Sequence, residues 1–286
     1  MRVVVTGGRG NIGRWSVDEL VRAGHEVTAI VRAEDEPPAD LLRPTEELFG
    51  EAGDAGLLAR AMDGADGVVH LAAIAAPTGR TAVELLLANS VTTMAVLEAA
   101  GEAGVRGAVI ASSLSALGMA WSEEWMSPLL LPVDEEHPLR PAEGYGLSKE
   151  QDEASARMAA RRWGMPVVAL RFPFVHTMET IRARSASTDP EVVRTLAREL
   201  WGYLDVRDAA RAVRLSLEAA VAGRIEGSLV LTVAADDLAV DGTLADLVHR
   251  WHPDYLGPVP ESGGAYDVSR AERILSFRAE HSIRAG

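Results

Sequence analysis

The 286-residue sequence predicts an α/β fold, a doubly wound parallel sheet followed by a smaller C-terminal region. Short β-branched runs, the first at Arg2–Thr6, alternate with longer segments whose apolar residues recur at helical spacing. A glycine-rich turn, Gly7–Gly13, joins the first run to the first helical segment. A strand, a glycine-rich turn and a helix in this order are typical of a Rossmann-type sheet.

The composition is ordinary for a globular protein, with 48% hydrophobic and 24% charged residues. The net charge of −14 argues against a nucleic-acid partner, because a phosphate backbone repels an acidic protein. The chain has no cysteine, and no His/Asp/Glu cluster has metal-ligand spacing, so we expect no bound metal. We see no signal sequence and no apolar run that approaches the length of a bilayer span. We therefore expect a cytoplasmic protein without a membrane partner.

The glycine-rich turn predicts a dinucleotide site. It fits both Gly-x-Gly-x-x-Gly and Gly-x-x-Gly-x-x-Gly, and a helix up to Gly24 and a strand at His25–Val31 follow it. Glycines let backbone N–H groups approach a pyrophosphate at a helix N-terminus, where the helix dipole favours anions. A purely structural turn does not need three glycines at this spacing. The expected cofactor contacts here are Gly7, Gly10, Asn11, Ile12 and Gly13.

The end of the second strand indicates which dinucleotide binds. An acidic residue there would accept a hydrogen bond from the ribose 2′-OH of NAD, but the chain reads Ile30-Val31-Arg32 and has Arg9 in the glycine-rich turn. Two guanidinium groups suit a 2′-phosphate, so the sequence favours NADP. NAD stays possible because the acidic run Glu34–Glu36 follows closely. Arg32 is alternatively a solvated loop residue.

Two further strands are expected to meet the cofactor. After a weak strand near Leu48–Gly50 come Glu51 and Ala52, where an acidic group can accept from the adenine amino group. Gly67–Ala73 is a buried run in which His70 reads as a packed core histidine. The small residues at the end of this run leave room for a cofactor against the backbone. The expected contacts there are Leu71, Ala72 and Ala73.

The middle of the chain adds polar groups to this edge. Asn89 lies within a predicted helix, Thr81–Glu102, and is one of the expected cofactor contacts. Once buried, it would need partners, most simply backbone groups of adjoining strands. A fifth strand, Gly107–Ala111, leads into Ser112–Ser115. Hydroxyls at the carboxyl end of a parallel strand lie where ligands bind, although serines there are also common turn formers.

Tyr145 and Lys149 lie at the start of a predicted helix, Glu143–Trp163. A spacing of four residues places both side chains on one helix face, and Lys149 is the only lysine in the chain. An adjacent ammonium favours the ionised form of a phenol, which otherwise exchanges protons poorly at neutral pH. The pair therefore predicts acid–base chemistry; the alternative is an exposed helix start that carries both residues by chance.

The remaining segments complete the predicted domains. A sixth strand, Pro166–Arg171, leads into Phe172–Thr177, and a further strand is expected at Ser228–Val233. The connection Ala120–Pro141 is irregular and is expected to cover the active face. We expect residues 1–171 and about 203–235 to bind the dinucleotide, and about 172–202 and 236–286 to form a small substrate-binding region. In this part the expected cofactor contacts are Phe172, Phe174 and Val175, and the expected substrate contacts are His176 and Thr177.

With Gly7–Gly13, Gly67–Ala73, Ser112–Ser113, Tyr145–Lys149 and Tyr203–Ala210 in this order, the chain resembles the extended short-chain dehydrogenase/reductases, often labelled NAD-dependent epimerase/dehydratases. The resemblance covers nearly the whole chain, up to the closing segment Tyr266–Phe277.

The resemblance implies a catalytic set. Tyr145 would give or take the proton, and Lys149 would bind the nicotinamide ribose and favour the phenolate. The family's serine stands five residues before a glycine, which selects Ser113 from Gly118 over its neighbours, with Ser115 as a further substrate contact. An arginine at the position of Arg9 occurs in family members that use NADP. Family members often pair through the helices that correspond to Thr81–Glu102 and Glu143–Trp163, which implies a possible homodimer.

Three departures from the family pattern favour a small substrate over a nucleotide sugar. The family's Asn-Val-Tyr-Gly-Pro reads Phe174–Met178 here, the segment Phe172–Leu204 is short, and the arginine-bearing run before Asp205 is absent. The leading hypothesis is an NADP-preferring oxidoreductase that acts on a small carbonyl or alcohol. The alternatives are a nucleotide-sugar epimerase or dehydratase with tightly held NAD(P), and a non-catalytic protein that senses the cofactor.

Overall fold

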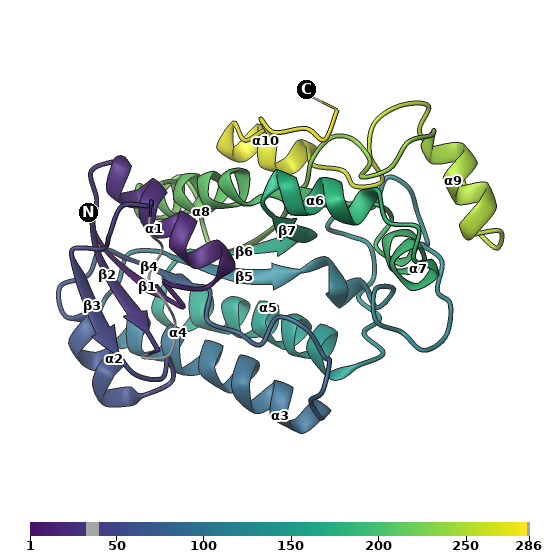
Figure 1. The fold of residues 1–286 in the computed structure, drawn as a ribbon. Helices are drawn as coiled ribbons and strands as arrows, with labels where there is room; N and C mark the ends of the chain where they lie inside the picture. Colours follow the sequence, from purple (N-terminus) through teal and green to yellow (C-terminus); the bar gives the residue numbers. More distant parts are fainter. Residues whose placement is uncertain (33–39, 285–286) are drawn as a thin grey trace.

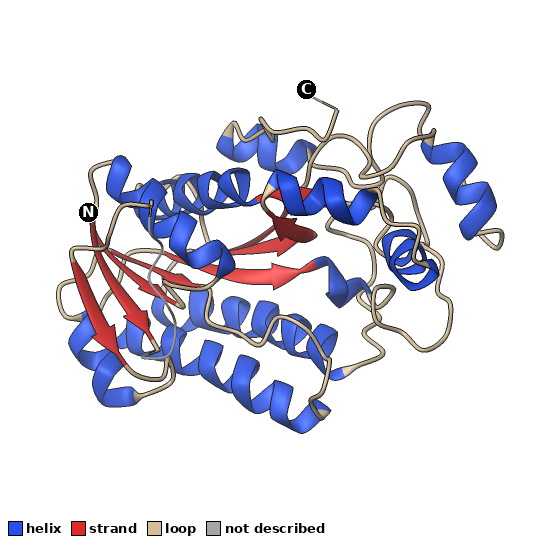
Figure 2. Ribbon diagram, viewed as in Figure 1, coloured by secondary structure: helices blue, strands red, loops and turns tan. Residues whose placement is uncertain are grey.

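The computed structural model describes residues 1–32 and 40–284. Within them, seven parallel strands form one sheet in the order β3-β2-β1-β4-β5-β6-β9 (Figure 2). The order reverses at β1, which has β2 on one side and β4 on the other. The predicted doubly wound parallel sheet is therefore confirmed. The strands are β1 Arg2–Thr6, β2 Glu26–Val31, β3 Glu46–Phe49, β4 Gly67–His70, β5 Ala108–Ser113, β6 Val167–Phe172 and β9 Ser228–Thr232.

Helices cover both faces of the sheet (Figure 1). One face carries α1 Asn11–Arg22, α8 Val206–Val221 and α10 Ser269–Leu275; the other carries α2 Ala55–Met62, α3 Ala82–Leu86, α4 Thr92–Glu102 and α5 Gly144–Trp163. Successive strand residues point to opposite faces, so Val3 and Val5 join the core under α8 while Val4 joins the core under α4. Because both faces are covered, these strands are continuous apolar runs rather than alternating ones.

A second hydrophobic core lies beyond the carboxyl ends of the strands and contains Leu117, Met119, Ile181, Trp201 and Tyr266. It is built from the segment after β5 and from α6 Met178–Ser185, α7 Pro190–Arg198, α9 Leu244–Trp251 and the chain before α10. β7 Phe174–His176 and β8 Tyr203–Asp205 form a separate two-stranded parallel sheet beside it. The domain bounds expected from the sequence stay a prediction.

The long helix expected at Thr81–Glu102 contains a π-helical turn, Leu87–Val91, between α3 and α4. Asn89 in this turn is fully buried. Its Oδ1 accepts from the Ile74 amide at 2.8 Å, and its Nδ2 donates to the Ile74 carbonyl at 3.0 Å and the Ser148 hydroxyl at 3.1 Å. The expectation that Asn89 would bond to adjoining strands is therefore wrong. β4 ends at His70, and Asn89 instead bonds to Ile74 in the segment that follows this strand.

The helix Ala82–Glu102 is long and apolar enough to cross a membrane, which corrects the expectation that no such run exists. A helix that packs in the core of a globular protein can have the same length and composition. Leu85, Val96, Leu97 and Ala100 of this helix are buried in the molecule. The finding therefore says nothing further about a membrane.

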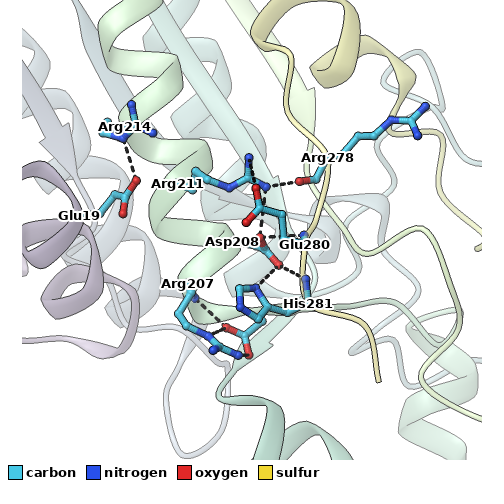
Figure 3. Close-up of polar contacts among 9 residues, drawn as sticks. Glu19, Arg207, Asp208, Arg211, Arg214, Arg278, Glu280 and His281 are labelled. Carbon is cyan, nitrogen blue, oxygen red and sulfur yellow. Dashed lines mark hydrogen bonds and ion pairs between the residues drawn. The ribbon is translucent and has the colours of Figure 1, made fainter. Parts of the chain in front are cut away.

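Asp208 on α8 anchors the end of the chain (Figure 3). Its two carboxylate oxygens accept from the amides of Glu280 and His281 at 3.0 and 2.9 Å, from His281 Nδ1 at 3.0 Å and from Arg211 Nη2 at 3.3 Å. Asp208 is 1% exposed. We call Asp208, Arg211, Glu280 and His281 the Asp208 cluster; it fixes the segment after α10 against α8.

Candidate active site

A cavity of about 450 Å³ lies at the carboxyl ends of the strands. Ligands bind at this edge of doubly wound sheets, beside the point where the strand order reverses. The cavity brings together residues predicted from five distant parts of the sequence. Those that line it are Gly10, Asn11, Ile12, Gly13, Leu71, Ala73, Ser113, Ser115, Tyr145, Lys149, Phe172, Phe174, Val175 and His176.

The glycine-rich turn is shaped by close backbone contacts. Gly7 has a φ of +70°, and a Cβ there would lie 2.8 Å from the amide nitrogen of Ala72. A Cβ on Gly13 would lie 2.0 Å from the Gly7 carbonyl oxygen. Gly7 and Ala72 therefore shape the turn rather than line the cavity.

The N-terminus of α1 faces this cavity without a side-chain cap. Gly10 is the capping residue, and within residues 1–32 and 40–284 no side chain caps the first amides of the helix. Amides left without such a partner are donors available to an anion. The Asn11 side chain instead donates to the Val175 carbonyl at 2.8 Å and so ties α1 to β7. The glycine-rich turn and the uncapped helix fit the pyrophosphate of a dinucleotide.

The two arginines expected at a 2′-phosphate have different surroundings. Arg9 forms a bidentate pair with Glu47 of β3, with Nε–Oε1 at 2.9 Å and Nη2–Oε2 at 2.6 Å. This hydrogen bond to Arg9 lowers the pKa of Glu47 below its usual value. Arg32 is exposed at the end of β2, Glu51 is exposed after β3 with Ala52 next to it, and none of these lines the cavity. The acidic run Glu34–Glu36 lies outside the described residues.

Tyr145 and Lys149 both line the cavity from the first turns of α5. Glu143 caps this helix by accepting from the amides of Tyr145 and Gly146. The glycines that flank the tyrosine let the helix approach its neighbours: a Cβ on Gly144 would lie 2.5 Å from Ala82 Cα, and one on Gly146 would lie 2.7 Å from the Ser115 carbonyl. The Lys149 ammonium lies 5.9 Å from the centroid of the Tyr145 ring.

The Lys149 ammonium has two protein partners. Its Nζ donates to the Ala111 carbonyl at 3.0 Å and to Asp152 Oδ2 at 3.0 Å. An ammonium has three donors, so one remains for a ligand or for the tyrosine. Burial lowers the pKa of Lys149, but the charges of Asp152 and Tyr145 more than offset this and raise it above 10.5. The sequence analysis missed Asp152, whose only signal was its position three residues after Lys149.

The structure separates the neighbouring serines. Ser112 donates to Glu153 Oε1 at 2.7 Å, and Glu153 also holds Arg171 with both of its oxygens, so this hydroxyl belongs to a buried ionic group. The Ser113 hydroxyl accepts from the Ser115 amide at 3.1 Å and keeps its own proton for another partner. Both serines line the cavity, and of the two only Ser113 has a hydroxyl proton that is not already donated to Glu153.

The other half of the cavity contains residues that the sequence analysis did not select, Met119, Ala120, Trp121, Arg198, Glu199 and Tyr266. Only two weak signals pointed here: Trp121 lies in the loop expected to cover the active face, and Tyr266 begins the closing segment. Burial raises the pKa of Glu199, and its pairing with Arg184 at 2.7 Å offsets part of that shift.

Thr177 does not line the cavity; its hydroxyl caps α6 by accepting from the Thr180 amide. Its expected role as a substrate contact therefore lacks support in the geometry. Among residues 1–32 and 40–284, no group of three or more His, Asp or Glu side chains is placed to hold a metal ion.

The comparisons with known proteins agree with this geometry. Residues 3–231 match the model of the NAD dependent epimerase/dehydratase family. The chain is 31% identical over 225 residues to an L-arabinose 1-dehydrogenase (NAD(P)(+)) from Haloferax volcanii, an alignment that covers 77% of this chain and 84% of that protein. It is 27% identical over 178 residues to a UDP-glucose 4-epimerase from Streptococcus mutans, covering 60% of this chain and 51% of the epimerase.

Solved structures show the same fold. A short-chain dehydrogenase/reductase superfamily protein from Agrobacterium tumefaciens with bound NAD superposes with a TM-score of 0.72 at 23% identity, over 99% of this chain and 94% of the other. The match to the family model spans most of the chain, from β1 to β9. The chain therefore belongs to the NAD-dependent epimerase/dehydratase family of extended short-chain dehydrogenase/reductases and is an NAD(P)-dependent oxidoreductase.

Proposed function

We propose that this enzyme oxidises a small alcohol or reduces the corresponding carbonyl, with net turnover of the nicotinamide cofactor and with Ser113, Tyr145 and Lys149 as its catalytic residues. One observation carries the proposal: these three side chains and the uncapped N-terminus of α1 line a single cavity. The turn and the helix would hold the dinucleotide. Ser113, His176 and the residues around Trp121 would hold the substrate.

Each residue has a chemical task in this proposal. The bound nicotinamide supplies the hydride acceptor or donor. Tyr145 takes the hydroxyl proton of the alcohol, or returns it to the carbonyl oxygen, and Ser113 donates a hydrogen bond to that oxygen. Lys149 places a positive charge beside the phenol and keeps one N–H donor for the cofactor ribose. The apolar wall of Leu114, Met119 and Trp121 excludes water.

The rival function is nucleotide-sugar epimerisation or dehydration, since the chain also resembles UDP-glucose 4-epimerases. Two observations favour the dehydrogenase. The alignment with the arabinose dehydrogenase spans 84% of that protein, whereas the chain spans about half of the epimerase. Only α6 and α7 separate β7 from β8, which leaves little chain for a nucleotide pocket.

The test uses Tyr145→Phe in the intact enzyme. A panel of small sugars, alcohols and carbonyls is assayed with NAD(P)+ and NAD(P)H, and UDP-glucose with product analysis. We expect net cofactor turnover with a small substrate and a loss of about 10²–10⁴-fold in kcat for the variant, while cofactor binding is retained. Unchanged kcat in Tyr145→Phe would refute the catalytic assignment. Epimerised UDP-sugar without net NAD(P)H would establish the rival.

We propose NADP as the preferred cofactor, with NAD as the alternative. The support is the pair Arg9 and Arg32 at the adenosine end and the absence of an acidic residue at the end of β2. Glu47 competes for Arg9, since it already accepts both arms of the guanidinium. Arg9→Gln should therefore lower kcat/KM for NADP at least about tenfold more than for NAD, and Glu47→Gln should raise the NADP-to-NAD ratio. Equal losses for both cofactors in Arg9→Gln would contradict this preference.

We also propose a homodimer that pairs through the helix Ala82–Glu102 and α5. Val83 of α3 and Leu87 and Val91 of the π-helical turn recur every four residues and are 64%, 60% and 57% exposed, so they form one apolar stripe. A second copy of the same stripe is the occupant that we expect, because a twofold axis brings identical patches together. Leu87→Glu should convert a dimer into a monomer in sedimentation experiments, and a native chain that sediments as a monomer would refute the pairing.

A further inference from the structure

Asp152 is a buried carboxylate with an unusual set of partners. Its residue is 1% exposed, and Oδ2 pairs with Lys149 Nζ at 3.0 Å. Its Oδ1 is buried and has no hydrogen-bond partner of good geometry among the described residues, although the Thr93 hydroxyl is near enough to lower the pKa. Burial is the largest influence and raises the pKa of Asp152 overall.

The next residue on the same helix shows how a purely structural carboxylate is treated. Glu153 is also 1% exposed, but both of its oxygens accept from Arg171, and Oε1 accepts from Ser112 as well. A buried charge with an incomplete set of partners costs free energy. Asp152 carries that cost beside the proposed acid–base pair, which points to a role in the reaction.

We propose that Asp152 is a positioning residue that sets the charge of the Tyr145–Lys149 pair: it keeps Lys149 an ammonium in a buried site and cancels part of that charge at the Tyr145 hydroxyl. This rests on the proposed function only in assigning the acid–base role to Tyr145. Asp152 also fixes the direction of the ammonium, because Asp152 and the Ala111 carbonyl take two of its three donors.

The other charged groups near the Tyr145–Lys149 pair leave Asp152 as the main counter-charge of Lys149. On α5 itself, Glu143 is occupied by the amides of Tyr145 and Gly146, and Glu153 is neutralised by Arg171 of β6. His70 of β4 is buried between the hydroxyls of Thr6 and Thr93, and burial, followed by the charge of Lys149, lowers its pKa to about 3, so it is neutral at physiological pH.

The remaining elements that pack on this part of α5 add no unpaired charge at the site. β5 contributes the Ala111 carbonyl, and α4 contributes the neutral Thr93. The acidic residue of α3, Glu84, is exposed and bonded to Thr81.

Removing the carboxylate has two consequences with the same direction in pH. While Lys149 stays charged, its positive charge is no longer balanced by a carboxylate and favours the phenolate. The phenol of Tyr145 therefore loses its proton at lower pH. Burial then acts on Lys149 without its counter-ion, so the ammonium loses its proton at lower pH too. Asp152→Asn should therefore move the whole pH window of activity towards acid.

The first measurement is the pH dependence of kcat for alcohol oxidation. We expect Asp152→Asn to shift both limbs down by about one to two pH units. Glu150→Gln is the matched control, because it removes the same charge from the same helix at a partly exposed position beside Lys149. Its limbs should stay within about 0.3 pH unit of the native enzyme, since solvent screens an exposed charge. A profile of Asp152→Asn that superimposes on the native one would overturn the proposal.

The second measurement reads Lys149 directly and needs no substrate. Because Lys149 is the only lysine in the chain, isotope-labelled lysine gives a protein with one side-chain ammonium signal in NMR. In the native enzyme the midpoint of its deprotonation should lie above the ordinary value for a lysine, and in Asp152→Asn the midpoint should move to lower pH. A native midpoint below the ordinary lysine value overturns the proposal even if the variant does not fold.

The two measurements also separate this proposal from the proposed function. If Tyr145→Phe retains turnover but the lysine signal behaves as expected, the catalytic assignment fails and the control of Lys149 by Asp152 stands. If the lysine signal is insensitive to Asp152 while Tyr145→Phe is inactive, the function stands and the role of Asp152 fails.

Discussion

Two buried aspartates on opposite faces of the sheet are used differently. Asp208 on α8 accepts four hydrogen bonds, two on each oxygen, from the Asp208 cluster (Figure 3). In the part of the chain that the structure describes, Asp152 on α5 has one ion pair, with Lys149, and an oxygen without a partner of good geometry. Both residues are 1% exposed, so burial alone does not distinguish them.

The difference shows how a structural carboxylate is told from one that serves the reaction. A carboxylate whose acceptor positions are all occupied fixes its neighbours, and a buried polar group with every partner in place adds to stability. An incompletely paired carboxylate lowers stability, and natural chains keep such groups mostly where function requires them. The identity of the residue and its burial are the same in both places; only the count of partners differs.

Removing the partner of Asp152 should have the largest effect. Lys149→Met leaves an unpaired buried carboxylate, so we expect a fall of about 3–5 kcal/mol in the free energy of unfolding and the loss of most activity. The double variant Lys149→Met/Asp152→Asn should regain much of the stability and none of the activity, because no buried charge remains. Urea unfolding at pH 7 measures both. If the double variant is no more stable than the single one, the pair is not the source of the cost.

Asp208→Asn should have the next largest effect, and only on stability. The variant turns an N–H group towards donors and weakens four hydrogen bonds, so we expect a loss of about 2–3 kcal/mol in the free energy of unfolding. The amides of Glu280 and His281 should exchange faster with solvent. Glu280→Gln is the control, since that side chain is 66% exposed in its pair with Arg211. If Asp208→Asn shifts the pH profile of kcat, then Asp208 also acts on the reaction and the stated difference from Asp152 is wrong.

At pH 7 the smallest expected effect concerns His70, because protonation of this residue changes stability only at lower pH. Its folded pKa of about 3 lies below the unfolded value of 6.5, so between these pH values the unfolded chain binds the proton and the folded chain does not. This contribution to stability is complete above pH 6.5 and is lost as the pH falls towards 3, with a slope of up to about 1.4 kcal/mol per pH unit.

His70→Gln removes this group. The slope of the free energy of unfolding against pH should therefore be smaller in the variant, by the equivalent of about one bound proton over that range. Urea unfolding at several pH values between 4 and 7, native and variant side by side, gives both slopes. Equal slopes would mean that His70 is protonated alike in the folded and unfolded states.

The local patterns of the chain predicted the sheet and the nucleotide end of the site. Strand, glycine-rich turn and helix are neighbours in sequence, so Gly7–Gly13 could be interpreted without knowing what packs against it. Ser112 and Ser113 both line the cavity, and they differ in that the Ser112 hydroxyl donates to Glu153. The roles of these residues in catalysis stay predictions.

The sequence did not reveal partners that are distant along the chain. Arg9 is expected at a 2′-phosphate, but nothing in the sequence indicated that β3 would bring Glu47 to it. Asn89 was expected to bond to the backbone of adjoining strands, but its backbone partner is Ile74, which lies after the end of β4. Arg198, Glu199 and Tyr266 were missed because no periodicity joins them to Tyr145; α7 and the closing segment reach the cavity only in the folded chain.

The sequence by itself determined the fold class, the cofactor-binding turn and the Tyr145–Lys149 pair, because each depends on spacings within one turn, strand or helix. Only the tertiary structure decided what Asp152 and Asp208 are for, because the partners of a buried charge come from elements that the sheet brings together. Asp208 meets the end of the chain 72 and 73 residues away, whereas Asp152 meets mainly the lysine one helical turn before it.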